Sequence, residues 1–478
     1  MTKKIILSSI AAVTLLSTTV NAASVKSRIS KLESIIKTQQ KEIKELKSVS
    51  DDVEELDERL EEVETSSLTD KIKFGVGMRV EMNNYSNTYA DGEEYTANDI
   101  WRTKLNLNMK SKIADNLKFS GRLSMYKNWG DSTSRMVNNV SMQGRRPNDS
   151  TMYVERAYVD WIMNADSTIP VTVTLGRQPS TDGPSYQIKE NSARKGTYDA
   201  LAFDGAADAI VLTANLNKIS TGTAVRVAYG TPNVLDNQAN TQNQMNYSGI
   251  DNDNFENTKV IGLFLDQTIP SLSFNNLAQA YFVSAKDFNA NPSMGANDIN
   301  VGDLTITGIM FEASKVNGNL DLFAHYAKSE AKPNGQAIVI GMNGTTPIMG
   351  GLISGMGDTE SKTGNAIWVG ARYSINKDWK VGAEYNKGSE NWFSFTSGSN
   401  DPLNKLATRG TAVEVYASSA INKYANIRVG CVAINYDYTG SGSQLGAPMK
   451  ISDMTLQTGS TMTIEKTTNA YLTFNLLF

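Results

Sequence analysis

Hydrophobic and polar side chains alternate along most of this chain, and the alternation is clearest at its end. From Lys466 to Phe478, apolar side chains fall on one face and polar side chains on the other, with Leu477 as the exception. This period of two predicts a β-strand with one face in apolar surroundings and one in polar or aqueous surroundings. The strand stops at an aromatic residue, Phe478, whereas a soluble domain has no need to end its chain inside such a strand.

The same alternation predicts sixteen strands. We place them at 71–84, 98–112, 116–129, 151–163, 169–177, 206–217, 219–231, 258–269, 275–287, 303–315, 318–331, 364–375, 379–391, 408–421, 424–438 and 464–478. The connections between them are alternately long and short, which is typical of antiparallel barrels that cross an outer membrane. We therefore predict an all-β membrane protein: an antiparallel transmembrane β-barrel of about 16 strands over 71–478, with lipid outside and a polar lumen. A soluble secreted β-protein is the alternative.

Residues 1–22 have the pattern of a secretory signal peptide. Lys3 and Lys4 precede an apolar run, and Val20-Asn21-Ala22 supplies the small residues of a cleavage site. The mature chain is therefore expected to leave the cytoplasm.

Residues 23–64 follow a different period. From Val25 to Leu46, core residues alternate at spacings of four and three, and the pattern resumes at Val49 after a skip. This spacing predicts an α-helical coiled coil, joined to the barrel by a linker at 65–70. The expected partner is the same helix of another copy, and a single helix folded onto the barrel is the alternative. The first half is rich in lysine, which indicates either contact with an anionic cell wall or a solvated surface.

Composition narrows the class of function. The 46 basic and 50 acidic residues nearly cancel, so the basic footprint of a nucleic-acid-binding protein is absent. The one cysteine, Cys431, falls on an apolar strand face and is interpreted as a small hydrophobic residue. The one histidine, His325, falls on an inward strand face, and no Ser or Asp set is recognisable around it. We expect no enzyme activity, no cofactor and no metal site.

A resemblance gives these features a common interpretation. The segment Val171-Thr-Val-Thr-Leu-Gly-Arg-Gln178 is similar to the strand before the third external loop of many bacterial porins. The signal peptide, the strands, the loop rhythm and Phe478 together resemble porins of the sixteen-stranded, usually trimeric type. An N-terminal coiled coil is similar to the arrangement in some anion-selective porins. The resemblance implies a passive channel that assembles as a homotrimer. It also implies that the barrel lies in the lipid of the outer membrane of a Gram-negative bacterium, with the coiled coil in the periplasm.

Charged residues on the expected lumen face are the candidate functional residues. In such porins the third long loop narrows the pore, which places the candidate constriction at 178–205. An excess of cations on the first strands predicts a preference for anions, although the barrel segment as a whole is nearly neutral. The candidate pore-lining residues are Arg79, Arg102, Lys104, Lys118, Arg122, Lys189, Glu190, Arg194, Lys195 and Asp199. Those in the loop can equally be solvated loop charges.

The long connection 332–363 is rich in glycine and unusually apolar. We expect it to contact another subunit or the pore mouth. It can equally form an extra hairpin, which would alter the strand count.

Two functions remain open at this point. The first is an outer-membrane porin for passive diffusion of small hydrophilic solutes or ions. The alternative is a structural barrel that anchors a coiled-coil tether between the outer membrane and the cell wall. Deletion of 24–64 separates them, because a pore keeps conducting without it.

Overall fold

The computed structural model describes residues 30–43, 71–129, 152–231, 258–290, 299–396, 400–454 and 463–478. The chain divides into an N-terminal unit, Met1–Lys71, and a barrel unit, Ile72–Phe478. In the N-terminal unit, residues 30–43 are helical and exposed on every side. The signal peptide, the linker and the rest of 23–64 lie outside the described residues, so the coiled coil stays a prediction.

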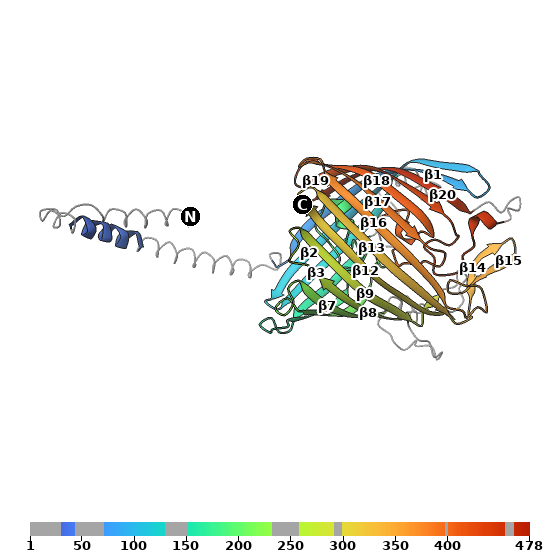
Figure 1. Cartoon of the computed structure of the whole chain (residues 1–478), viewed down its shortest axis with the longest axis horizontal. Helices are drawn as coiled ribbons and strands as arrows, with labels where there is room; N and C mark the ends of the chain where they lie inside the picture. The colour runs from blue at the N-terminus through green and yellow to red at the C-terminus, as the bar shows by residue number, and fades with distance from the viewer. Residues whose placement is uncertain are drawn as a thin grey trace, which may run out of the picture. The chain divides into compact units, whose positions relative to one another are not determined.

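The barrel unit is a closed antiparallel barrel of sixteen strands (Figure 1). Each strand pairs with the next, and the last barrel strand pairs with the first. The barrel strands are β1 Lys73–Tyr89, β2 Glu94–Ala114, β3 Leu117–Asn128, β4 Met152–Ile162, β5 Val171–Arg177, β6 Asp208–Asn215, β7 Thr223–Gly230, β8 Lys259–Gln267, β9 Asn275–Lys286, β12 Gly302–Val316, β13 Leu320–Pro333, β16 Lys362–Ser374, β17 Trp379–Gly388, β18 Gly410–Ala420, β19 Ala425–Tyr436 and β20 Ile464–Leu477. Each of the sixteen predicted ranges overlaps one of these strands, so the predicted strand count is confirmed.

The end of the chain closes the barrel. Strands β1 and β20 pair from Gly77 opposite Leu477 to Tyr89 opposite Ile464. Next to the first of these pairs, the backbone N–H groups of Val76 and Phe478 each donate to the other residue's carbonyl oxygen, at 2.7 and 3.0 Å. The predicted closing strand is therefore confirmed, and closure leaves no unpaired sheet edge in the barrel.

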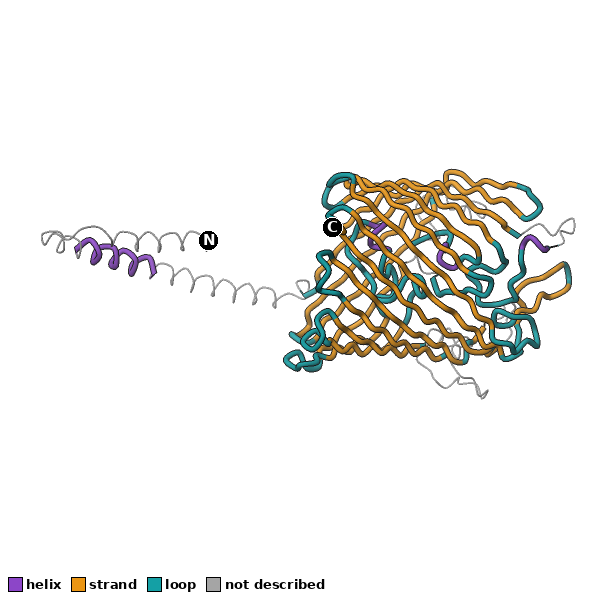
Figure 2. Tube along the Cα trace, viewed as in Figure 1, coloured by secondary structure: helices purple, strands orange, loops and turns teal. Residues whose placement is uncertain are grey.

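The outer wall of the barrel carries the apolar half of each alternating strand, and loops gather at the two barrel ends (Figure 2). Eight outward aliphatic side chains taken from five strands are between 44% and 60% exposed: Ile210, Leu212, Ile261, Leu263, Ile309, Val413, Val415 and Val429. Cys431 also lies on this face and is exposed. A soluble protein rarely leaves a continuous apolar surface of this extent uncovered.

Two short hairpins stand outside the barrel sheet. The connection 332–363 forms one of them, from β14 Ile338–Asn343 and β15 Thr346–Gly350. The other pairs β10 Asn289–Ala290 with β11 Ile299–Asn300. The extra hairpin that the sequence left open is therefore present, but it forms its own two-stranded sheet and does not change the barrel count.

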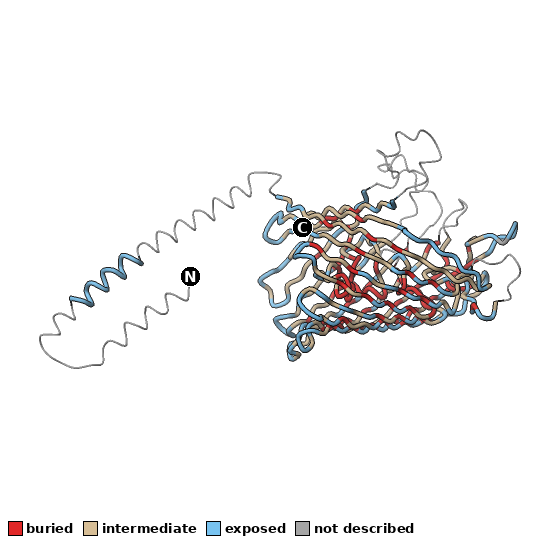
Figure 3. The backbone as a smooth tube through the Cα atoms, turned by 90° about the horizontal axis from the view of Figure 1, so that it is seen from above, coloured by how far each residue is buried: buried red, intermediate tan, exposed pale blue. Residues whose placement is uncertain are grey.

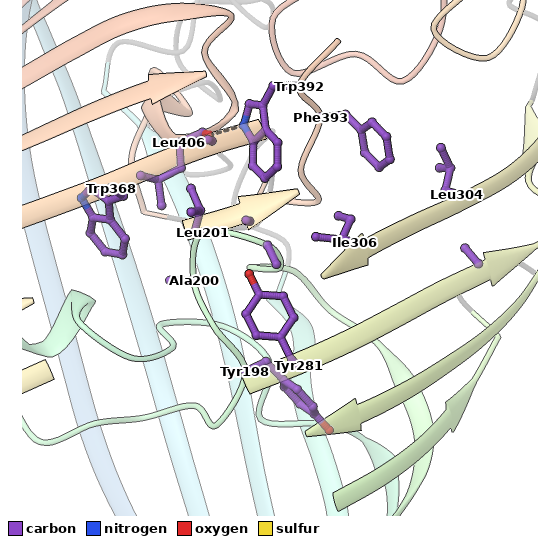
Figure 4. Packing of buried hydrophobic residues seen from close by; sticks show 14 of the residues in the cluster. Tyr198, Ala200, Leu201, Tyr281, Leu304, Ile306, Trp368, Trp392, Phe393 and Leu406 are labelled. Carbon is purple, nitrogen blue, oxygen red and sulfur yellow. Dashed lines mark hydrogen bonds between the residues drawn. The ribbon is translucent and has the colours of Figure 1, made fainter. Parts of the chain in front are cut away.

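The inside of the barrel holds a hydrophobic core (Figure 3). Inward side chains of β6 to β16 pack against two loops, 178–207 and 389–409, which we name the inner loop and the second inner loop. Figure 4 shows part of this core, in which the Trp392 indole donates to the carbonyl oxygen of Leu406 at 2.8 Å. The prediction of a polar lumen is therefore wrong for this side of the barrel. Alternation fixes which side chains point inward but not whether they meet water or protein.

Candidate functional site

The inner loop crosses the lumen and is held on several sides of the wall. Its short helix α4, Tyr186–Glu190, follows Ser185, whose backbone φ of 75° lies in the left-handed region. Gly183 packs so closely on the backbone of Tyr198 that no Cβ would fit. This tight turn aims Glu190 at β1 and β19, while the Ser185 backbone N–H donates to Glu312 on β12 at 2.9 Å.

Glu190 is the centre of the first charged cluster. Its carboxylate lies 2.9 Å from Nη1 of Arg79 on β1 and 3.0 Å from Nη2 of Arg428 on β19. Burial alone would raise the pKa of Glu190, but the guanidinium groups of Arg428 and Arg79 hold it well below the ordinary value. Glu81 pairs with Arg79 and also with Arg102. The cations of this wall are therefore largely neutralised by carboxylates.

A second cluster joins both inner loops to the wall. Lys189 of the inner loop lies 3.0 Å from Glu414, which also contacts Lys405 of the second inner loop. Lys405 Nζ is 2.6 Å from Glu384, and the Tyr471 hydroxyl donates to Glu414 at 2.5 Å. Burial would lower the pKa of Lys405, but Glu384 and Glu414 raise it well above its ordinary value. This lysine therefore stays charged although it is fully buried.

A third cluster lies on β2, β3 and β4. Glu155 is 2.9 Å from Arg122 and 3.3 Å from Lys104. The neighbouring Arg156 donates to the backbone carbonyl oxygens of Thr181 and Lys195 in the inner loop, at 2.7 and 2.6 Å. These bonds hold the loop against the wall on this side as well.

Two polar cavities adjoin at the first cluster. One has a volume of about 320 Å³ and reaches the short turn at Tyr424. The other has a volume of about 30 Å³ and is walled by residues of β18 and β20. Arg79, Asp182, Glu190 and Asn400 line both cavities. The Arg79–Glu190 ion pair therefore lies between two polar cavities on the β1 and β20 side of the lumen.

His325 joins three residues that the sequence did not bring together. Its Nδ1 lies 2.8 Å from Asp199 Oδ1, and its Nε2 lies 2.8 Å from Ser185 Oγ. The expectation that no Ser or Asp set surrounds this histidine is therefore wrong. Ser185 Oγ also lies 3.1 Å from Glu312, and all of these side chains are buried. With Ser185 fully buried, no substrate carbonyl can reach its hydroxyl in this conformation, and the network holds the loop against β12 and β13.

The ten predicted pore residues fall into four groups. Six of them lie in the ion-paired clusters, where all but the partly buried Arg79 and Arg102 are buried: Arg79, Arg102, Lys104, Arg122, Lys189 and Glu190. Arg194 and Lys195 are partly exposed and form longer pairs of 3.8 Å. Lys118 is exposed near the short-turn end of β3. Asp199 lies apart from the others, with His325 in the hydrophobic part of the lumen.

Sequence reasoning missed the second inner loop. The apolar pair Trp392 and Phe393, fully buried here, was a usable signal, because a solvated loop gains nothing from two adjacent large aromatic residues. No sequence pattern indicates that Lys405 is buried, because only strand pairing brings its carboxylate partners close to it.

Within the described ranges, no group of three or more His, Cys, Asp or Glu side chains is placed to hold a metal ion. None of the helices in those ranges has the length and hydrophobicity to cross a membrane.

Residues 94–478 match the model of a family described as a protein of unknown function, DUF3373. The chain belongs to this family. The match covers the barrel from β2 to the end, including both inner loops. No curated protein matches the chain.

Solved structures of similar arrangement include outer-membrane proteins at low identity. OprB of Pseudomonas putida matches with 13% identity and a TM-score of 0.48, covering 86% of this chain and 95% of that one. OmpF of Salmonella typhi, solved with daunomycin, matches with 12% identity and a TM-score of 0.45, covering 86% and 99%. OmpT of Vibrio cholerae matches with 14% identity and a TM-score of 0.43, covering 85% and 97%. The fold assignment rests on the strand pairing itself.

Proposed function

We propose that this protein is an outer-membrane channel for the passive diffusion of small hydrophilic solutes or ions. The observation that carries the proposal is a closed barrel with an apolar outer wall and a cavity inside it that charged residues line. Apolar outer side chains suit lipid, and a closed barrel satisfies every backbone group without water. The predicted signal peptide at 1–22 supports export, and the apolar outer wall supports a place in the outer membrane of a Gram-negative bacterium.

Anion preference is the finer part of this proposal. The buried cations of the clusters are paired, so they add little net positive charge. The exposed lysines Lys73, Lys110 and Lys118 lie on inward positions at the short-turn end of β1 to β3, with Lys73 directly opposite Lys110. A basic mouth raises the local concentration of anions. Selectivity of this origin does not require any charged side chain to be buried.

Assembly is the second finer part. The coiled-coil spacing at 23–64 supports a trimer whose stalk stands in the periplasm, and its lysine-rich half supports contact with the cell wall. The hairpin β14–β15 carries the exposed side chains Ile340, Met342 and Ile348. Such an apolar edge suits contact with a neighbouring subunit.

The test is reconstitution of the mature protein in planar bilayers under a salt gradient. Discrete current steps in groups of three are expected, with a reversal potential that favours the anion. Lys73→Glu, Lys110→Glu and Lys118→Glu combined should move the reversal potential toward the cation. The control is the double variant Lys218→Glu with Lys377→Glu, whose lysines lie on other short turns. This double variant should change the reversal potential little. A reversal potential that favours the cation in the wild-type protein would contradict the anion preference.

A tether between outer membrane and cell wall is the second candidate. One observation favours it: two loops fill much of the lumen, and the smaller polar cavity has a volume of only about 30 Å³. A folded, heat-modifiable protein that gives no current would support the tether. A variant lacking 24–64 that still conducts would support the channel.

A further inference from the structure

The larger polar cavity beside the first charged cluster is built around an inward-facing glycine. Gly77 of β1 lies opposite Asn106 of β2 and Leu477 of β20, and all three residues line the cavity. The backbone does not require glycine here, because its φ is not positive and a Cβ would find no neighbour closer than 3.6 Å. The missing side chain therefore leaves open a hollow of about 320 Å³, at the lower end of the range of about 300–1,000 Å³ for small-molecule sites.

Two amide groups on the cavity wall are fixed at one end and leave the other end available. Asn108 Oδ1 accepts from Nε of Arg122 at 2.8 Å, and Asn191 Oδ1 accepts from Nζ of Lys380. Guanidinium and ammonium groups only donate hydrogen bonds, so each asparagine turns its oxygen toward them and its NH2 group elsewhere. The Asn191 NH2 group has no partner among the described residues, and the bond of the Asn108 NH2 group to the Gly75 carbonyl oxygen is long, at 3.4 Å. Both residues line the cavity and supply it with N–H donors.

A pair of asparagines on the last two strands supplies both a donor and an acceptor. Asn426 of β19 lies opposite Asn475 of β20, and the Asn475 amide donates to Asn426 Oδ1 at 3.1 Å. A bonded pair of amides leaves one NH2 group and one oxygen over, whichever way round the two amides lie. These remaining groups have no partner in the described part of the chain, and both side chains are partly exposed and line the cavity. A hydroxyl group both donates and accepts, so it satisfies the pair.

Lys195 of the inner loop is a cation that can take a further partner. Arg156 donates to its backbone carbonyl oxygen at 2.6 Å, which fixes the loop at this point. The Lys195 ammonium lies 3.8 Å from Asp182, too far for a hydrogen bond, and the side chain is 31% exposed and lines the cavity. Lys423, exposed at the short turn, also lines the cavity and has no carboxylate partner within the described ranges. The other cations of the lining are held by carboxylates, so these two lysines remain for an anion.

We propose that this cavity binds a small carboxylate that also carries hydroxyl groups, of the sugar-acid class. Its carboxylate accepts from Lys195 and from the asparagine N–H groups, and its hydroxyls bond to the pair of Asn426 and Asn475. Both features are needed, because lysine alone would suit any anion and amides alone would suit any polyol. This assignment names the solute class of the proposed channel and rests on that function only for the passage of the bound solute. No covalent step is involved.

The test measures binding to the mature protein in detergent micelles by saturation-transfer NMR. The probes are gluconate, sorbitol and acetate. Sorbitol replaces the carboxylate of gluconate by an alcohol, and acetate keeps the carboxylate without the hydroxyls. We expect saturable binding of gluconate, with a Kd about tenfold or more below that of either other probe. Equal binding of gluconate and acetate would reveal an unselective anion site, and equal binding of gluconate and sorbitol a polyol site. Either result would overturn the proposal.

This binding measurement does not depend on conduction. A protein that binds gluconate without conducting overturns only the channel. A protein that conducts without saturable binding of gluconate overturns this proposal.

Variants of two adjacent inner-loop cations locate the carboxylate. Lys195→Gln should weaken gluconate binding about tenfold and leave sorbitol binding unchanged. Arg194→Gln removes the same charge from a residue that does not line the cavity, although its pair with Glu312 is also 3.8 Å long. It should weaken gluconate binding less than about twofold, because an exposed charge outside the site is screened. Equal losses in the two variants would overturn the assignment.

Two further variants test the hydroxyl contacts and the hollow. Asn475→Ala removes the asparagine pair and should reduce the preference for gluconate over acetate, a ratio measured within one variant and so independent of the folded fraction. Gly77→Val fills the hollow and should weaken gluconate binding, with heat-modifiable migration on gels as the check that the barrel has closed. An unchanged ratio in Asn475→Ala, or unchanged gluconate binding in a closed Gly77→Val barrel, would overturn the proposal.

Discussion

The imidazole Nδ1 of His325 lies 2.8 Å from Oδ1 of Asp199, and this contact joins the barrel wall to the inner loop. The other ring nitrogen contacts Ser185, at the opposite end of the same loop segment. Both ends of the segment that contains α4 are therefore fixed by one side chain of β13. The only histidine in the sequence thus has a structural role that depends on both partners, Asp199 and Ser185.

Replacing this histidine should loosen the inner loop. His325→Ala leaves buried Asp199 and Ser185 without their shared partner, so the free energy of unfolding should fall by about 1–3 kcal/mol. His325→Gln keeps one hydrogen bond and should lose less. Urea unfolding in detergent measures the difference, and single-channel recordings should show noisier current in His325→Ala. Equal stability of His325→Ala and the wild type would contradict this role.

The Ser185 hydroxyl should not react as a nucleophile, although its distance to His325 is suitable for one. The side chain is fully buried and also lies 3.1 Å from Glu312. The folded protein should therefore remain unlabelled by a fluorophosphonate probe detected by mass spectrometry. The Ser185→Ala variant is the negative control for this labelling. Labelling of the wild type that is absent from Ser185→Ala would reveal an open state with esterase-like reactivity.

Acid should release the inner loop only far below the usual carboxyl range. The pKa of Glu190 is lowered in the folded state by Arg428 and Arg79, against the effect of burial. Its stabilisation is therefore complete above the ordinary value of 4.5 and is lost as the pH falls through the lower folded value. Urea unfolding at a series of pH values should show this loss in the wild type.

The matched variant for this effect is Glu190→Gln. It leaves two buried guanidinium groups without their shared carboxylate, so it should be less stable by about 3–5 kcal/mol at neutral pH. It should also lack the Glu190 part of the acid transition and move the reversal potential further toward the anion. A variant with the same pH slope as the wild type would show that another carboxylate carries the effect.

Lys405 should be needed because two carboxylates face it, not because an ion pair is stabilising in itself. Lys405→Met leaves Glu384 and Glu414 buried without this cation and should cost about 3–5 kcal/mol of unfolding free energy. Lys405→Met combined with Glu384→Gln should recover much of that loss, since Lys189 still neutralises Glu414. Thermal unfolding of the three proteins provides the comparison. No recovery in the double variant would indicate that packing of the lysine stem dominates.

The barrel could be predicted from the sequence because strand alternation is local. The predicted ranges 275–287 and 424–438 differ from β9 and β19 by no more than two residues at either end. Lipid and lumen impose a period of two on every strand, so each strand carries its own signal. The strand count and the closing strand followed directly.

The interior could not be predicted in the same way. Glu190 meets Arg428 across 238 positions of sequence, and Asp199 meets His325 across 126. Such pairs form only when a loop folds to a particular place inside the barrel, and no periodic pattern in the loop sequence indicates that place. One signal was present: the run Val260-Ile-Gly-Leu-Phe-Leu265 is apolar on both faces, which indicates protein or ligand on the inside as well as lipid on the outside.

The packed half of the lumen narrows the opening that the proposed channel can use. The packed, carbon-lined side is an electrical insulator, so the cross-section open to ions is smaller than a circumference of sixteen strands implies. The current of the proposed channel should therefore be confined to the side next to the seam where the barrel closes, and charge changes on the opposite inner wall should leave that current unchanged.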